Sequence, residues 1–201
     1  DFTGAWATPI LIRGQKFILL QLPNATNTAY GTKGITFLFD YRQNRWSTLF
    51  GWDSNLSLPT RWPGWSYHNI WGRHFVGGNG EIFELKSDTY QNDGGVQRVL
   101  VRTGHYDQFG EARIDNIRAR FKRGLANPNN ARSVVGLRVR RDNKSWTRWR
   151  RIDLGRHGES DPYVEFGGMG CASTFQLEFD MTDAAEFELV KCQAQISGLG
   201  Y

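Results

Sequence analysis

The stretch "GLRVRRDNKSWTRWRRIDLG" (residues 136–155) decides the fold class, because it places seven Arg or Lys residues and two Trp in a strand-like pattern. Apolar and basic side chains alternate before Asp142-Asn143, which is the period-two pattern of a strand buried on one face. Asp and Asn favour turns, and a second alternating run follows them. The stretch therefore predicts a β-hairpin with arginines on its outer face.

Each strand of this hairpin divides its side chains between two faces. On the first strand, Leu137 and Val139 face inward, and the outward positions belong to Arg138 and Arg140. On the second strand, alternation predicts one side with Trp146, Arg148, Arg150 and Ile152, and the opposite side with Thr147, Trp149, Arg151 and Asp153. The inner face must pack against a second sheet, and the Trp side chains can cover the arginine stems.

The outward basic residues admit three interpretations: a contact with another subunit or partner, a solvated face, or a contact with DNA phosphates. Arg outnumbers Lys here, which suits planar, bidentate contacts. Charge-driven DNA binding would be independent of sequence and sensitive to salt. A second basic stretch, "RARFKR", alternates in the same way. The candidate contact residues are Arg138, Arg140, Arg141, Lys144, Arg148, Arg150 and Arg151 of the hairpin, and Arg118, Arg120 and Arg123 of the second stretch.

Strand signals continue along the chain of 201 residues, and no window keeps a helical period. "RQN" between "ITFLFDY" and "RWSTLF" predicts one hairpin turn, and Asn79-Gly80 predicts a type I′ turn. Shifting "FLFDYRQNRW" (37–46) by 46 residues aligns it with "FELKSDTYQN" (83–92), a period typical of a four-stranded propeller blade. The polar segment "SDTYQNDGG" (87–95) predicts a linker, and longer alternating strands follow it. We therefore predict an all-β protein with β-propeller blades in 1–95 and a β-sandwich-like domain in 96–201.

The sequence contains no motif for catalysis, nucleotide binding or metal binding. "GGNG" (77–80) lies between two strands, which predicts a hairpin turn rather than a phosphate-binding loop. His68 and His74 flank the predicted strand "NIWGR" on one face, about 20 Å apart, too far to share an ion. We predict no enzyme, no cofactor and no metal site.

The two cysteines, Cys171 and Cys192, fall in a hairpin predicted from "STFQLEFDM" and "EFELVKCQAQI". Its register places Cys171 opposite Ile196 and Cys192 opposite Phe175, which keeps the sulfurs beyond disulfide distance. We expect two reduced thiols and a reducing assembly compartment. The longest apolar run, "FILLQL" (17–22), is too short to span a membrane. The net charge of +5 favours an acidic partner.

Three stretches resemble known families. "RRDNKSWTRW" (140–149) resembles the Asp-box of sialidase-like propellers, a structural turn motif, with Lys144 at the position of its glycine. "KFILLQLPNATNTAYGTKGITFLFDYRQNRWSTLFG" (16–51) is similar to the packaged-DNA stabilisation proteins, or tail hubs, of short-tailed bacteriophages. From "RTGHYDQFGEARIDNIRARFKRG" to "FQLEFDMTDAAEFELVKCQAQI", the order of turn, Leu-Gly steps and Phe-rich hairpin also resembles that family. Lys144, Phe166 and Met169-Gly170 depart from the family's glycine, Trp and Leu-Gly.

The resemblance to the tail hub family implies a β-propeller followed by a β-sandwich-like domain, with this chain as the C-terminal part of a longer protein. It implies a non-catalytic virion protein of the phage tail, assembled in the host cytoplasm, that extends the portal channel and helps to retain packaged DNA. The implied partners are further copies in a hexameric ring, portal or tail adaptor proteins, and a distal fibre, spike or needle. Non-specific contact with packaged DNA and no membrane insertion are also implied.

Two alternatives stay open. "FDYRQNRWSTL" also looks like a kelch strand, and "FVGGNG" is similar to the kelch Gly-Gly pair, which favours a protein-binding propeller. The other alternative is a propeller-type carbohydrate-binding protein or glycosidase. That class requires arginines that converge on one carboxylate beside acidic partners.

Overall fold

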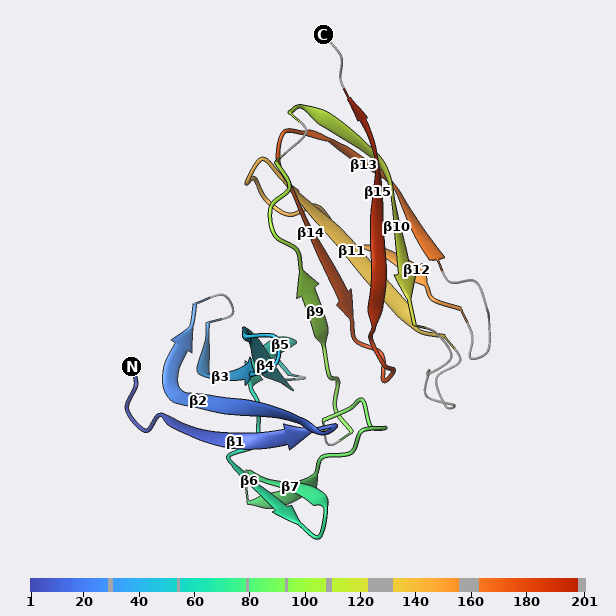
Figure 1. Cartoon of the computed structure of the whole chain (residues 1–201). Coiled ribbons are helices and arrows are strands. Elements are labelled where there is room, and N and C mark those ends of the chain that lie inside the picture. Colours follow the sequence, from blue (N-terminus) through green and yellow to red (C-terminus); the bar gives the residue numbers. More distant parts are fainter. Residues whose placement is uncertain are drawn as a thin grey trace. The chain divides into compact units, whose positions relative to one another are not determined.

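In the computed structural model, the described residues form fifteen β-strands and no helix (Figure 1). The structure describes residues 1–28, 31–53, 55–78, 80–92, 94–107, 110–122, 132–155 and 163–198. The chain divides into two compact units, Asp1–Gln97 and Arg98–Tyr201. The all-β prediction is confirmed.

The first unit holds two antiparallel meanders, in which each strand pairs with its neighbour in the sequence. The five-stranded sheet consists of β1 (Trp6–Ile12), β2 (Gln15–Asn27), β3 (Thr32–Asp40), β4 (Arg45–Asp53) and β5 (Leu58–Arg61). The three-stranded sheet consists of β6 (Ser66–Ile70), β7 (Arg73–Gly78) and β8 (Glu81–Glu84). The core of this unit is built from buried apolar residues of both parts: Ile10, Leu19, Leu38, Trp62 and Val76.

Two hairpins predicted in this unit are confirmed. β3 and β4 pair up to Asp40 and Arg45, and Asn44 takes a positive φ of 51° in the turn between them. β7 and β8 pair Gly78 with Glu81, which leaves a two-residue turn with Gly80 at a φ of 86°. Asn79, the other residue of that turn, lies outside the described residues.

The strand predicted across "NIWGR" is wrong, because the chain reverses there. The two-residue turn Trp71-Gly72, with φ values of 52° and 76°, joins β6 to β7. His68 and His74 therefore lie on neighbouring strands and on opposite faces of the sheet, not on one strand. The sequence pattern missed this turn because a bulky residue such as Trp rarely takes a positive φ.

The 46-residue repeat is also wrong. Residues 37–46 form the end of β3, a turn and the start of β4, whereas residues 83–92 leave the strand conformation after Glu84. The two segments align in sequence because their apolar residues match, but their backbone conformations differ. The repeat therefore gives no support to a blade period.

The second unit consists of two antiparallel sheets that share one apolar core, a β-sandwich arrangement. One sheet has the order β12 (Arg150–Asp153), β11 (Val134–Arg141), β14 (Phe175–Met181) and β9 (Val99–Arg102). The other has the order β13 (Tyr163–Ala172), β10 (Ala112–Phe121) and β15 (Leu189–Gly198). The largest core side chains come from both sheets and are at most 1% exposed: Ile117, Leu137, Phe166, Phe179 and Met181.

The hairpin predicted from β14 and β15 is wrong, because the chain crosses from one sheet to the other between them. β14 pairs with β11 and β9, whereas β15 pairs with β10. Cys171 consequently lies opposite Arg113, and Cys192 lies opposite Ala119, and both are free thiols. Alternation alone did not separate a hairpin from a crossover, because each strand has one apolar face in either arrangement.

Replacing Trp71 by Asn is expected to raise the free energy of unfolding by about 0.5–1 kcal/mol, because Asn tolerates a positive φ and Asn-Gly is the preferred type I′ pair. Trp71 is 95% exposed, so the substitution removes no core contact. Urea unfolding measures the change. Trp71→Ala keeps the strained φ and is the control; an equal gain in both variants would contradict the turn as the cause.

Candidate functional site

The outer face of the four-stranded sheet carries buried charge. β14 lies between β11 and β9, and all seven of its residues are buried. Its apolar residues point into the core: Phe175, Leu177, Phe179 and Met181. The alternate residues Gln176, Glu178 and Asp180 therefore point to the opposite face. Carboxylates buried to this extent require charged partners.

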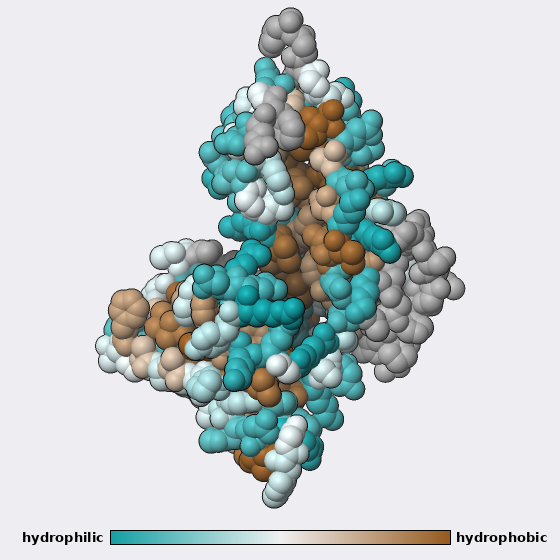
Figure 2. Space-filling view, in the orientation of Figure 1, coloured by the Kyte–Doolittle hydropathy of each residue, from teal (hydrophilic) through white to brown (hydrophobic). Residues whose placement is uncertain are grey.

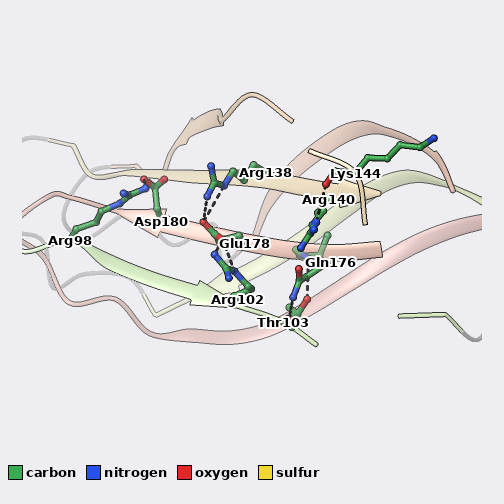
Figure 3. Close-up of polar contacts among 10 residues, drawn as sticks. Arg98, Arg102, Thr103, Arg138, Arg140, Lys144, Gln176, Glu178 and Asp180 are labelled. Carbon is green, nitrogen blue, oxygen red and sulfur yellow. Dashed lines mark hydrogen bonds and ion pairs between the residues drawn. The ribbon is translucent and has the colours of Figure 1, made fainter. Parts of the chain in front are cut away.

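Glu178 is held by two arginines, one from each flanking strand (Figure 3). Arg138 of β11 donates from Nε and Nη2 to Oε1, at 3.1 and 2.6 Å. Arg102 of β9 approaches Oε2 with Nε at 2.8 Å and Nη2 at 2.7 Å. The Glu178 side chain is 0% exposed, so both of its oxygens are compensated inside the protein. This contact ties together three adjacent strands.

Asp180 is held in a similar way. Arg98 Nη2 lies 3.1 Å and Arg151 Nη2 lies 3.5 Å from its Oδ2. Its Oδ1 has no hydrogen-bond partner among the described residues. Gly136 is paired opposite Asp180 on β11, and a Cβ at Gly136 would collide with this Oδ1. The glycine therefore leaves the space that the carboxylate occupies.

Two tryptophans lie against the arginines. The Trp146 ring centroid is 4.9 Å from Cζ of Arg138 and 5.2 Å from Cζ of Arg102. The Trp149 ring centroid is 4.5 Å from Cζ of Arg138 and 5.7 Å from Cζ of Arg98. Such cation–π contacts gain strength when water is excluded. We name the whole set the arginine–carboxylate layer: Glu178, Asp180, Arg98, Arg102, Arg138, Arg151, Trp146 and Trp149.

The predicted β11–β12 hairpin is confirmed, with its turn at Asp142-Asn143. These two residues take φ values of 47° and 57°, and Lys144 N donates to Arg141 O across the turn at 2.8 Å. Positive φ at both central residues is the requirement of a type I′ turn, which Asn and Asp tolerate. The buried side chains of the first strand, Leu137 and Val139, also lie on the predicted inner face.

The faces predicted for the second strand are wrong at Trp146. Leu137 pairs with Arg150, whereas Arg140 pairs with Trp146, so the second strand holds one extra residue between these pairs. A one-residue bulge reverses the alternation of side chains. Trp146 therefore lies with Trp149 on the face of the arginines. Strict alternation had placed these two residues on opposite sides.

The structure separates the ten predicted basic residues by their partners. Arg138 and Arg151 belong to the arginine–carboxylate layer. Arg140 donates to the carbonyl oxygens of Lys144 at 2.9 Å and Asn143 at 3.0 Å, and so braces its own turn. These three arginines are therefore engaged within the fold.

Two further predicted arginines also have partners inside the second unit. Arg150 donates to the carbonyl oxygens of Gly167 and Gly168 on β13. Arg118 pairs with Glu165. The remaining predicted residues are Arg120, Lys144 and Arg148, which are exposed and form no ion pair with any described residue; Arg141, which is partly buried beside Gly170; and Arg123, which lies outside the described residues.

The acidic side of this layer was not predicted from the sequence. Its signal is the strict alternation in "FQLEFDM", where a polar residue follows each of three large apolar residues. A strand with this pattern buries its apolar face, but the pattern does not say that neighbouring strands cover its acids as well. The partners Arg98 and Arg102 lie about 80 residues away in sequence, so spacing could not pair them with β14.

Both oxygens of Glu178 accept hydrogen bonds from arginines, so the layer consists of buried ion pairs. Within the described ranges, no group of three or more His, Cys, Asp or Glu residues could hold a metal ion. The same part of the chain has no helix that is long and apolar enough to cross a membrane.

The first unit contains a separate open cavity of about 670 Å³, bordered by the turn Arg13-Gly14, by residues 72–74 and by residues 84–90. Arg73 donates from Nε and Nη2 to Glu84 at 2.8 and 2.7 Å on its wall. The hydrogen bond from Arg73 lowers the pKa of Glu84. The cavity wall is therefore lined by paired charges.

Comparison with known proteins gives no family. No family model and no curated protein matches this chain. Among solved structures, a similar one is an exo-β-1,3-galactanase from Phanerochaete chrysosporium bound to β-1,3-galactotriose, at 8% identity and a TM-score of 0.22. The match covers 94% of this chain and 56% of that chain, so this chain spans about half of its length.

Replacing Glu178 by Gln is expected to lower the free energy of unfolding of the second unit by about 2–4 kcal/mol, because it leaves two arginines beside an uncharged partner. Denaturant unfolding measures the loss. Glu165→Gln is the matched control: its pair with Arg118 is largely exposed, so the expected loss is under about 1 kcal/mol. Similar losses in both variants would contradict a stabilising role of the layer.

Replacing Gly136 by Ala is expected to destabilise the second unit by about 1–3 kcal/mol, because the added methyl group takes the space of the Asp180 carboxylate. The matched control is Gly104→Ala, where a Cβ would meet no atom within 4 Å. Thermal unfolding of both variants measures the difference. A tolerated Gly136→Ala would show that Asp180 does not need this space.

Proposed function

We propose that this chain is a structural subunit of a multi-chain assembly, of the kind that tail hub proteins of short-tailed bacteriophages form. In that role it extends the portal channel, helps to retain packaged DNA and attaches distal tail components in a virion assembled in the host cytoplasm. The family resemblance of the sequence and an exposed aromatic face of the first unit support the proposal.

The observation that carries the proposal is the aromatic face of the β3–β4 hairpin, defined as Phe37, Phe39, Tyr41 and Trp46. The ring centroids of Trp46 and Phe39 are 4.9 Å apart, and those of Phe39 and Tyr41 are 5.4 Å apart. Trp46 is 57% exposed and Tyr41 is 58% exposed. Exposed aromatic residues gathered in one patch are typical of protein–protein contacts.

The position of this face on its sheet supports a sheet-to-sheet contact. Phe37 and Phe39 alternate with Leu38, which is buried in the core, so they lie on the outer side of the five-stranded sheet. A propeller blade buries both faces of its meander against neighbouring sheets. We propose that the two meanders are blades of a β-propeller and that the aromatic face packs against a further sheet.

We propose that the exposed basic residues Arg120, Lys144 and Arg148 contact another subunit. Packaged DNA is the second candidate partner for these residues. Their charge has no ion-pair partner among the described residues, in contrast to Arg138 and Arg151. A contact with DNA phosphates would weaken steeply as salt rises, whereas a flat salt dependence would argue against it. A filter-binding titration of the protein with duplex DNA over a salt series separates the two.

The direct test of the assembly is the oligomeric state of the full-length protein, measured by light scattering and imaged by electron microscopy. Rings that bind portal or tail adaptor proteins are expected. A dilute monomer in every buffer that binds neither partner would overturn the proposal.

Trp46→Ser is expected to weaken self-association at least about 10-fold, because it removes a large ring of the aromatic face that is 57% exposed. Analytical ultracentrifugation measures the association, and thermal unfolding checks that the first unit stays folded. Trp71→Asn, which removes another exposed Trp of the same unit, is the control and should associate like the parent protein. Unchanged association of Trp46→Ser would remove this face from the interface.

A further inference from the structure

We propose that β15 pairs antiparallel with β15 of a second copy of this chain, which joins two three-stranded sheets into one six-stranded sheet. All the residues that carry this proposal belong to the second unit. It goes beyond the proposed function, which names no contacting strand and which would survive the failure of this pairing.

β15 is an uncovered edge strand. Among the strands that the structure describes it pairs with β10 alone, and every residue from Val190 to Gly198 is exposed. The register places Cys192, Ala194 and Ile196 opposite buried β10 residues of the core face, which are Ala119, Ile117 and Ile114. The apolar face of β15 therefore continues the core face without cover. Figure 2 shows apolar atoms at the surface along this part of the second unit.

The opposite sheet leaves core side chains exposed at the same edge of the sandwich. At the other edge, β13 approaches β11 and β12. Counted from that edge, one sheet has the order β13, β10, β15 and the other has the order β12, β11, β14, β9. β15 and β9 are therefore the last strands of their sheets at the opposite, uncovered edge. Val101 of β9 is paired with the core residue Phe179 and is 37% exposed, close to the 36% of Ile196. The sheet that contains β15 has three strands and packs against a sheet of four. There is therefore room for one more strand beside β15.

The β13 edge of the same sheet is protected against strand addition. Its pairing with β10 shifts between Gly167 and Gly170, where Gly168 and Gly170 take φ values of 63° and 87°. Arg150 occupies the carbonyl oxygens of Gly167 and Gly168. Bulges and occupied backbone groups are devices that block edge pairing. Residues 190–198 of β15 instead contain a single charged side chain, Lys191.

A second β15 fits this edge in charge. Opposite residues of an antiparallel pair lie on the same face of the sheet. The registers that place the apolar faces of both β15 strands on one side are therefore those in which one residue lies opposite its own copy. When the centre is Cys192, Gln193 or Ala194, Lys191 lies opposite Gln193, Gln195 or Ser197, none of which is charged. The two lysines never oppose each other in these registers. Because the β13 edge is blocked, a head-to-tail contact with it is disfavoured, and the two-fold pairing remains.

The length of β15 also suits a stable contact. The ladder with β10 shifts between Leu189 and Lys191, so the regular part of β15 is Lys191–Gly198, eight residues that extend over about 26 Å. A strand pair of this length, with its side chains, removes on the order of 1,000 Å² of surface from water over both chains, which reaches the lower bound for a specific interface. A strand of another protein would gain no more backbone pairing than β15 itself.

The test compares two Cys→Asp variants on the two edge strands of this sheet. Cys192 lies on the apolar face of β15, and Cys171 lies on β13 opposite Arg113; both are exposed in the single chain. Cys192→Asp is expected to raise the dimer dissociation constant at least about 10-fold, because it places a carboxylate on the buried side of the paired strands. Cys171→Asp is expected to leave it unchanged. Sedimentation equilibrium measures the constant, and thermal unfolding checks both folds.

Cross-linking gives a second measurement that does not depend on stability. In the Cys171→Ser variant only Cys192 carries a thiol, and the three registers offset the two Cys192 residues by at most four positions, about 13 Å. A bis-maleimide of that span is expected to link the dimer, and Cys192→Ser is expected to give no link. A monomer at all concentrations overturns the pairing. An oligomer whose dissociation constant does not change in Cys192→Asp overturns the pairing of β15 but leaves the proposed assembly intact. A monomer that binds a strand of another protein at β15 has the same two consequences.

Discussion

The buried carboxylate of Glu178 constrains how three strands of the second unit align. Removing a carboxylate from water costs several kcal/mol unless charged partners replace the solvent. The pairing places Arg138 of β11 and Arg102 of β9 directly opposite Glu178, so the same three residues set the register of three strands. A slip of one position would turn Glu178 into the core and Phe179 out of it. Charge compensation and core packing therefore specify the same alignment.

This constraint changes what the basic composition of the chain means for function. The hairpin with seven cations resembles a surface strip, yet Arg138 and Arg151 neutralise acids of β14, and Arg140 and Arg150 hold backbone carbonyls. Their charge is part of the folded structure and is not offered to a partner. Beside the exposed basic residues Arg120, Lys144 and Arg148, the exposed surfaces include the aromatic face of β3–β4 and the edge of β15, which has one apolar face and one charged residue between Val190 and Gly198. Assembly between β-sheets is therefore better supported than binding driven by charge.

The sequence predicted elements whose signals are local. Alternation and the Asp142-Asn143 turn located the β11–β12 hairpin, since Asn and Asp mark positive φ. The Trp71-Gly72 turn was missed because Trp is a poor turn former, and in this hairpin its backbone takes an unfavourable positive φ. The bulge at Trp146 and the crossover after β14 were missed because each depends on which strands pair, not on the segment itself. The partners of Glu178 were invisible for the same reason, because three distant strands bring them together.

The two edges of the three-stranded sheet differ in a way that bears on assembly. β13 is bulged at glycines and has two carbonyls occupied by Arg150, whereas β15 presents ten residues with one lysine. An open, weakly charged edge promotes uncontrolled pairing unless a partner covers it. On this sheet, closing one edge and leaving the other open restricts strand addition to β15, and an antiparallel pair of two β15 strands joins two copies. The aromatic face belongs to the other unit and is a different surface from the β15 edge. A chain with two unlike contacts can build assemblies larger than a dimer.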